Sequence, residues 1–299
     1  MLVAGVTFLL LIAGALVTSN DAGLSVPDWP TSFGSLYKLP RMVGGVKFEH
    51  GHRMVAELVG MLTIILAVWT WRADRRGWVR KLGVAALATV IAQGILGGIT
   101  VLFYLPPAVS TAHATLAQTF FCIVVVLALV TGPGWTELPR QELPESHRLQ
   151  LTTLATLAAG SVYVQLMLGA GFRHSGIKLL PHLISAVVVT TLVLWTITRV
   201  LTNYGSVAAL RRPAVVLMAL LVTQLGLGFA AYLTRVQWGQ DAVQPELPMV
   251  ISTVAHVAVG ALVLASTVVL AMQAWRNMGT VQQECEAVSP ADLRKAVNA

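Results

Sequence analysis

The sequence predicts an all-α membrane protein whose eight transmembrane helices form two tandem four-helix bundles. Of its 299 residues, 56% are hydrophobic and only 11% are charged, whereas a soluble domain carries about 25% charged residues. The mean hydropathy is +0.74, and the apolar residues form continuous runs instead of the alternation that barrel strands need. This composition excludes a soluble enzyme, a disordered chain and a disulfide scaffold.

Eight apolar segments are each long enough to cross roughly 30 Å of hydrocarbon as a helix. The first has no basic region before its apolar run, so we expect a retained helix and not a cleaved signal peptide. The expected spans are residues 2–18, 50–71, 82–103, 111–131, 151–171, 179–200, 213–236 and 249–274.

The positive charges cluster in the short joints between the apolar segments, so the net charge of +7 follows a membrane pattern and does not indicate nucleic acid. By our topology, 13 of the 20 Lys and Arg residues fall on one side. The positive-inside rule then predicts a multi-pass protein of the cell (inner) membrane with both termini in the cytoplasm. The loops near 19–49, 104–110, 172–178 and 237–248 would face outward.

An internal repeat divides the chain into two halves. The third, fifth and seventh helices carry the related strings Gln93-Gly-Ile-Leu-Gly97, Gln165-Leu-Met-Leu-Gly169 and Gln224-Leu-Gly-Leu-Gly228. The fourth and eighth helices open with Ser110-Thr-Ala-His113 and Ser252-Thr-Val-Ala-His256. We therefore expect parallel repeats with equivalent sites at one depth. The predicted parts are an N-terminal half (1–131), a cytoplasmic linker (132–150), a C-terminal half (151–275) and a polar cytoplasmic tail (276–299).

Four histidines, His52, His113, His182 and His256, each fall near the start of an even-numbered helix, two in each half. By the predicted topology, all four lie toward the outer side. Ionisable groups inside a bilayer are by default functional. Imidazole pairs on facing bundle helices suit axial ligation of a haem iron, whereas zinc needs three or four ligands packed closely. The pattern favours haem without excluding other ligands.

The two halves differ around these histidines. Glu49, Arg53 and Glu57 share one face of the second helix beside His52, whereas His182 has no acid or base next to it. The asymmetry predicts that one half does chemistry and the other holds a cofactor. Arg53 could pair with Glu49 or with a haem propionate, since its planar fork binds carboxylates bidentately.

These residues resemble the haem A synthase family over nearly the whole chain. The resemblance rests on Glu49-x-x-His52-Arg53, on one histidine pair in each half, and on the outer loop Gly23-Leu-Ser-Val-Pro-Asp-Trp-Pro30. Many members carry two cysteines in this loop, at the positions of Val26 and Ser32 here. A mechanism that relies on those thiols is therefore not available to this chain.

The resemblance implies a membrane oxidoreductase that hydroxylates the C8 methyl of haem O twice, and the diol then loses water to give the formyl group of haem A. His182 and His256 would ligate a resident haem b, and His52 and His113 would bind the substrate haem, so that all four are iron ligands. Glu49 would handle a proton or stabilise positive charge, and Arg53 would pair with Glu49 or a propionate.

The resemblance also leaves several questions open. Membrane lipid surrounds the chain, the electron acceptor has a quinone as a candidate, and a haem O synthase or an oxidase assembly factor is a candidate partner. The sequence assigns no role to Glu57, His174 or the tail. Two alternatives remain at this stage: a di-haem b-type cytochrome that passes electrons between quinone and a partner and has no need of Glu49, and a transporter without haem.

Overall fold

The structure is a computed structural model that describes residues 1–145, 147–239 and 244–279. Within these residues, eight helical segments are long and apolar enough to cross a membrane, which confirms the predicted all-α class and span number. They are α1 (Leu2–Ser19), α2 (Val46–Ala73), α3 (Gly77–Leu102), α4 (Pro107–Val130), α6 (Leu151–Arg173), α7 (Leu179–Asn203), α8 (Ala208–Ala231) continued by the π-helix η1 (Tyr232–Gln237), and α9 (Leu247–Asn277).

Several helices begin before the apolar run that predicted them. α2 begins at Val46 and not at 50, and α4 begins at Pro107 and not at 111. Proline suits the first helical position because its fixed φ is helical and its missing N–H has no helical partner there. The linker also contains a short helix, α5 (Pro133–Thr136), that hydropathy did not predict.

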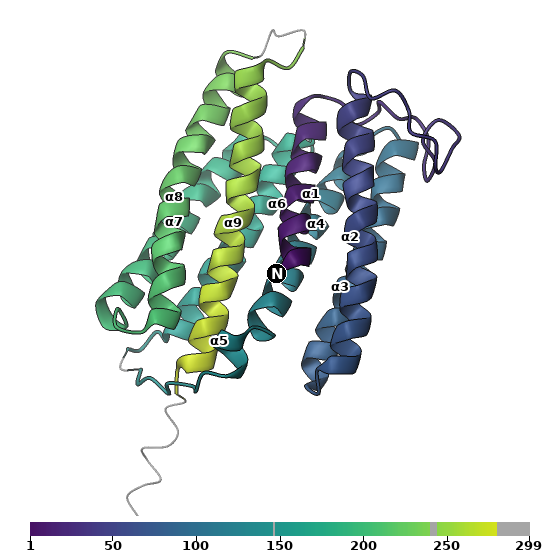
Figure 1. The fold of residues 1–299 in the computed structure, drawn as a ribbon. Helices are drawn as coiled ribbons and strands as arrows, with labels where there is room; N and C mark the ends of the chain where they lie inside the picture. Colours follow the sequence, from purple (N-terminus) through teal and green to yellow (C-terminus); the bar gives the residue numbers. More distant parts are fainter. Residues whose placement is uncertain (146, 240–243, 280–299) are drawn as a thin grey trace, which may run out of the picture.

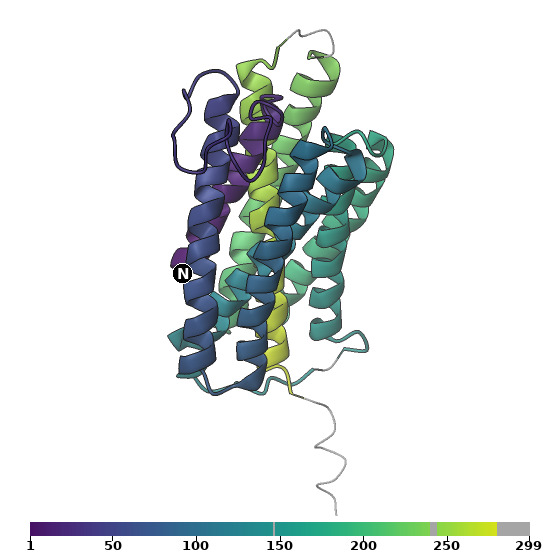
Figure 2. The same ribbon diagram turned by 90° about the vertical axis from the view of Figure 1, so that its right-hand side faces the viewer.

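The helices pack as neighbouring pairs that build two groups (Figures 1 and 2). α1, α2, α3 and α4 contact one another in sequence, and α6 to α9 do the same in the second half. The groups meet where α1 and α4 pack against α9 and α4 packs against α6. Ala261 and Ala265 of α9 join the core of the first group. The arrangement is consistent with tandem four-helix bundles that share an interface along α9.

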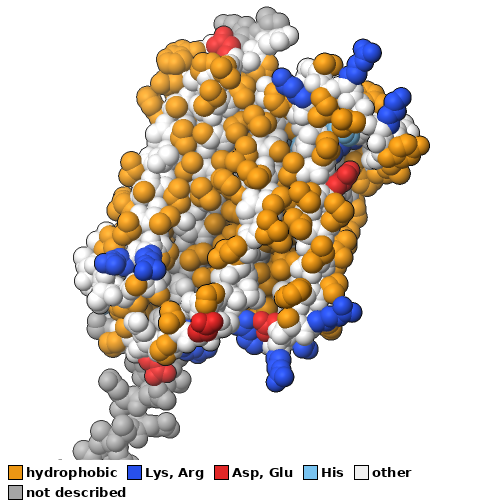
Figure 3. Space-filling view, viewed as in Figure 1, with side chains coloured by type: hydrophobic (Ala, Val, Ile, Leu, Met, Phe, Trp, Pro, Cys, Tyr) orange, Lys and Arg blue, Asp and Glu red, His pale blue; other side chains and the backbone are white. Residues whose placement is uncertain are grey.

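The outer surface of the bundle has the distribution expected of a membrane span. Hydrophobic side chains cover the sides of the helices, and most charged side chains gather toward the two ends (Figure 3). Large apolar residues such as Ile65, Val187 and Val222 are more than half exposed, which water would penalise and lipid does not.

The linker is fastened to the second half by a buried ion pair. Arg199 of α7 donates to Glu145 at 2.9 Å and to the Leu149 carbonyl at 2.8 Å. The Leu151 N–H at the start of α6 donates to the second Glu145 oxygen at 2.7 Å. Partial burial raises the pKa of Glu145, but the hydrogen bonds from Leu151 and Arg199 outweigh it and hold the pKa below its ordinary value.

The predicted tail lies outside the described residues beyond Gly279.

We predict that Glu145→Ala destabilises the protein by on the order of 2–3 kcal/mol, because it leaves the Arg199 cation buried and unpaired. Thermal unfolding of the detergent-solubilised chain measures this. Since the pKa of Glu145 is lowered on folding, its stabilising effect is present at neutral pH and is lost as the pH falls below about 4.5. Glu137→Ala, at an exposed acid of the same linker, is the control. Equal unfolding temperatures for the two variants at pH 7 would contradict the assignment.

Candidate functional site

Each of the four predicted histidines packs against a glycine of the preceding membrane helix. His52 faces Gly14 of α1, His113 faces Gly97 of α3, His182 faces Gly169 of α6, and His256 faces Gly228 of α8. A Cβ atom on these glycines would lie 3.1, 3.3, 3.0 and 3.0 Å, respectively, from Cε1 of the facing ring. Glycine at these positions therefore lets each ring lie against the neighbouring helix.

Three of these glycines follow the glutamines of the repeated strings. The Gln93 amide donates to the His113 carbonyl at 2.9 Å, and the Gln165 amide donates to the His182 carbonyl at 3.0 Å. The Gln224 amide nitrogen lies 3.5 Å from Nε2 of His256. The glutamines of the repeated strings thus contact the histidine of the following helix. The sequence analysis did not predict these contacts. α1 has Leu10 in place of the glutamine.

In His182, the ring nitrogen Nδ1 is directed toward the preceding helix. Nδ1 of His182 lies 3.2 Å from the Gln165 carbonyl oxygen. Donation by Nδ1 leaves Nε2 as a lone-pair donor, the state that metal ligation requires. His52, His113 and His256 likewise interact with the backbone of Leu10, Gln93 and Gln224 on the preceding helices. In the part of the chain that the structure describes, the side-chain oxygens of Gln93, Gln165 and Gln224 are buried without a hydrogen-bond partner. Buried polar atoms in this state are rare, and they concentrate around the histidines.

The two histidines of the C-terminal pair lie close together. The ring centres of His182 and His256 are 6.3 Å apart, with their planes at 81°. A metal bonded to both imidazoles at about 2 Å would hold the ring centres about 6 Å apart. Among the described residues, no group of three or more His, Cys, Asp or Glu side chains could hold a metal ion. A pair of imidazoles is a ligand set that a porphyrin iron can accept, whereas a zinc site has three or four protein ligands.

The N-terminal pair is less closely defined. His52 of α2 and His113 of α4 belong to the same four-helix group, and His113 is near enough to act electrostatically on His52. Both rings rest on glycine as the C-terminal pair does. The structure therefore gives the two halves a common way of positioning imidazole.

Glu49 and Arg53 form a buried ion pair that holds the outer loop. Arg53 donates to Glu49 at 2.6 Å, and Glu49 is only 4% exposed. The second Glu49 oxygen accepts the Val26 N–H at 2.8 Å. Arg53 also donates to three loop carbonyls, those of Val26, Asp28 and Thr31, at 3.1, 2.7 and 3.0 Å. We expected Arg53 to pair with Glu49 or with a haem propionate, and the structure pairs it with Glu49. Glu57, on the same helix, is exposed.

The loop is also shaped from within. Asp28 accepts the N–H groups of Phe33 and Gly34, both at 2.7 Å, and the Thr31 hydroxyl. Slight burial raises the pKa of Asp28, but these hydrogen bonds outweigh it and the pKa is lowered. Trp29 lies so close to α3 that a Cβ on Gly98 would be 2.5 Å from its ring. The Pro-Asp-Trp-Pro string therefore lies against the adjoining ends of α2 and α3.

The two positions that carry cysteine in many relatives have other contacts here. Val26 is fully buried. The Ser32 hydroxyl lies 3.0 Å from Nδ1 of His50. His50 is thus bonded to the loop, which is held in place here without the cysteine pair.

His174 lies where the two halves meet. Burial, followed by the nearby charges of Arg173, His113 and Arg235, lowers the pKa of His174 to about 4. The side chain is therefore neutral at pH 7. A residue of the C-terminal half is thus an electrostatic neighbour of an N-terminal site histidine, which sequence spacing could not reveal.

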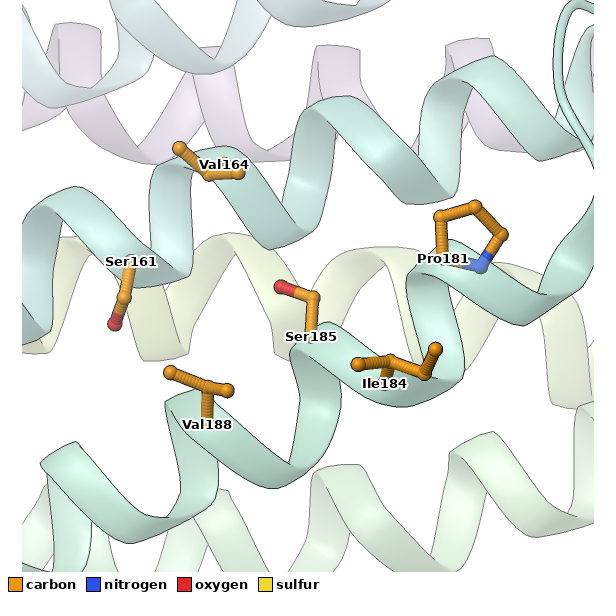
Figure 4. A pocket seen from close by; sticks show the side chains of 6 residues that line it. All are labelled: Ser161, Val164, Pro181, Ile184, Ser185 and Val188. Atoms are coloured by element: carbon orange, nitrogen blue, oxygen red, sulfur yellow. The ribbon is translucent and has the colours of Figure 1, made fainter.

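An apolar pocket of about 560 Å³ flanks the helix turn that carries His182. Figure 4 shows its lining, which comes from α6 and α7 and consists of Ser161, Val164, Pro181, Ile184, Ser185 and Val188. Ile184 and Val188 are more than half exposed, so the pocket opens on the membrane-facing surface. Its lining suits an apolar group.

Together, these features define a membrane protein with eight spanning helices in its described residues and with two histidines in each half. Comparison with known proteins agrees with this class. Residues 46–180 match the model of the COX15-CtaA family, described as cytochrome oxidase assembly protein. The chain is 29% identical over 177 residues to a protein named heme A synthase from Lysinibacillus sphaericus, which covers 58% of this chain and 56% of that protein.

Two further relatives are also named heme A synthase. That from Shouchella clausii is 36% identical over 121 residues, 40% of each chain. That from Alkalihalophilus pseudofirmus is 32% identical over 124 residues, 41% of each chain. The match to the protein from Lysinibacillus sphaericus spans about half of that protein's length. Over part of its length the chain is thus similar to proteins named heme A synthase, the family that its motifs resemble.

We predict that Arg53→Ala releases the outer loop and destabilises the protein by roughly 3 kcal/mol, because Glu49 is left as an unpaired buried carboxylate. Limited proteolysis within residues 26–34 and thermal unfolding measure the two effects. Arg41→Ala, at an exposed cation of the same loop, should change neither. Protection of the loop equal to that of the unchanged chain would show that Arg53 does not hold it.

Proposed function

We propose that the chain is a haem A synthase of the cell membrane, which oxidises the C8 methyl of haem O to a formyl group. The observation that carries the proposal is that each half has a pair of histidines that pack against glycines. The N-terminal pair also includes the histidine of the Glu-x-x-His-Arg turn, and the chain is similar to proteins of that name. The bound porphyrin iron would supply the oxidising chemistry. Conversion of a methyl to a formyl group takes one oxygen atom from water and releases four electrons and four protons.

The proposal gives the two histidine pairs different tasks. His182 and His256 hold the resident haem b, and His52 and His113 hold the substrate haem. The ion pair of Glu49 and Arg53 and the loop that it binds belong only to the N-terminal half, which supports turnover there. The outer loop would cover the substrate.

Glu49 and Arg53 act at the edge of the N-terminal site. Both Glu49 oxygens are engaged, one by Arg53 and the other by Val26. The Glu49 carboxylate, three residues before His52, would stabilise positive charge that develops on the oxidised substrate. Proton transfer at Glu49 would require one of its hydrogen bonds to open. Arg53 is the positioning residue that orients Glu49 and the loop.

The remaining partners and the orientation belong to the same proposal. Both termini would lie in the cytoplasm and both haem sites toward the outer side, which the basic residues of the joints support. A membrane quinone would accept the electrons, and a haem O synthase or an oxidase assembly factor would exchange haem with the chain. The alternative of a di-haem electron carrier is not favoured, because the relatives of the chain are named for haem A synthesis.

Expression of the chain with a supply of haem O, followed by chromatography of the extracted haems, tests the function directly. We expect haem A from the unchanged chain. His182→Ala and His256→Ala should remove the resident haem, whereas His52→Ala and His113→Ala should abolish haem A while some haem stays bound. Glu49→Ala should lose haem A and keep haem b. Equal haem loss from both halves, or haem A formation by Glu49→Ala, would contradict the assignment.

A glycine pair in α8 tests the packing that the function requires. Gly228→Ala should displace the His256 ring and lower the haem bound per chain several-fold, because its Cβ would lie 3.0 Å from the ring. Gly226→Ala is the matched control, since a Cβ there meets nothing within 4 Å. The Soret absorbance per protein measures both. Similar haem contents in the two variants would show that the glycine does not position His256.

A further inference from the structure

Two arginines at the outer end of the C-terminal half have no carboxylate partner among the described residues. Arg173 ends α6, and Arg235 lies in the π-helix that continues α8. Neither has an ion pair within the described part of the chain. The nearest acid that acts on Arg173, Asp21, does so from beyond ion-pair distance. Like charges brought together in a low-dielectric region repel each other, so this arrangement favours a bound anion.

A chain of hydrogen bonds fixes where these arginines lie. Arg173 donates to the Ala15 carbonyl at 3.2 Å and to the Ser19 hydroxyl at 2.5 Å. The Ser19 and Thr253 hydroxyls are 2.9 Å apart. The Thr234 hydroxyl, next to Arg235, lies 2.7 Å from that of Ser252, next to Thr253. α1, α6, η1 and α9 therefore converge at this point, and Arg173 and Arg235 are electrostatic neighbours.

The cluster lies directly outward of the C-terminal histidine pair. Arg173 is four residues beyond Gly169, which backs His182, and Arg235 is seven residues beyond Gly228, which backs His256. At 1.5 Å per residue these separations are about 6 and about 10 Å along the helices. A porphyrin held between the two rings would bring its carboxylates to this distance from the iron. Arg173 is also near enough to act electrostatically on His256.

The same positions of the N-terminal half lack this charge. Four residues beyond Gly14 the chain has Thr18, and seven beyond Gly97 it has Tyr104. The N-terminal arginine, Arg53, is already bound to Glu49 and to loop carbonyls. The cation pair of Arg173 and Arg235 is therefore a feature of the C-terminal half, the half that would keep its haem.

We propose that Arg173 and Arg235 form a carboxylate-binding site for the propionates of the porphyrin held by His182 and His256. This inference rests on the proposed function. Bidentate guanidinium–carboxylate bonds are among the strongest hydrogen bonds in proteins. They fix the rotation of the haem about the axis through the two imidazoles, and they add a constraint that makes this haem resident.

Binding of haemin and of haemin dimethyl ester tests the site without a measurement of turnover. The full-length chain, produced in haem-deficient cells as the His113→Ala variant to silence the N-terminal site, is titrated in neutral detergent and followed by its Soret band. We expect the free acid to bind at least about tenfold more tightly than the ester. Arg235→Gln and Arg173→Gln should lower that ratio toward one, with the affinity for the ester unchanged.

Two variants control for folding and for charge. The side chain of Arg235, in η1, makes no hydrogen bond to another described residue, so Arg235→Gln should fold even if Arg173→Gln, which loses the contact with α1, does not. Arg235→Lys should retain part of the ratio. Arg211→Gln, at an exposed position of α8, should retain all of it.

A ratio near one in the parent chain, or an unchanged ratio in Arg235→Gln, overturns the inference. If Arg235→Gln instead loses tightly bound anionic phospholipid, the arginines hold a lipid phosphate and the inference is wrong. Haem A formation by the unchanged chain, combined with a ratio near one in the His113→Ala variant, would contradict this inference alone. Failure of the chain to bind either porphyrin would overturn the proposed function as well.

Discussion

The contact between an imidazole ring and a glycine of the preceding helix is the constraint on which the rest of the structure depends. It occurs four times, in the helix pairs α1/α2, α3/α4, α6/α7 and α8/α9. A larger residue at any of these glycines would push the ring away from the neighbouring helix. In each pair the glycine lies near the end of one helix and the histidine near the start of the next. The helix pair is thus the smallest repeated unit of the site.

The two halves build different surroundings on this common plan. In the N-terminal half, Glu49 and Arg53 direct their hydrogen bonds to the loop, and so the site has a fixed cover. In the C-terminal half, Arg173 and Arg235 have no acidic partner among the described residues, and an apolar pocket opens beside His182 toward lipid. A covered site suits a molecule that is bound, changed and released, whereas a site with such cations suits one that stays. This difference supports the proposal that one half takes the substrate and the other the cofactor.

The sequence predicted what depends on hydropathy and on local spacing. The eight spans were confirmed, because continuous apolar runs leave a helix as the main solution in lipid. The glutamine strings identified three of the four glycines that back histidines. Gly14 escaped notice because α1 has Leu10 where the others have glutamine. The start of α2 at Val46 was missed because Lys47 and Glu49 interrupt the apolar run while the helix continues.

Contacts between distant parts of the chain could not be predicted in this way. Arg53 binds backbone carbonyls more than 20 residues away, and carbonyls leave no trace in a sequence. The hydrogen bond between Ser32 and His50 and the meeting of Arg173 with Ser19 likewise depend on how separate helices pack. Sequence motifs therefore located the histidines, but the residues that support them required the three-dimensional structure.

Electron paramagnetic resonance of the oxidised, purified chain tests the central claim most directly. Two imidazoles on one iron, with their planes near the 81° found for His182 and His256, should produce a low-spin ferric signal with the strong anisotropy of perpendicular ligand planes. A high-spin signal would show that the two rings do not share an iron, and it would contradict the assignment of His182 and His256 as an axial pair.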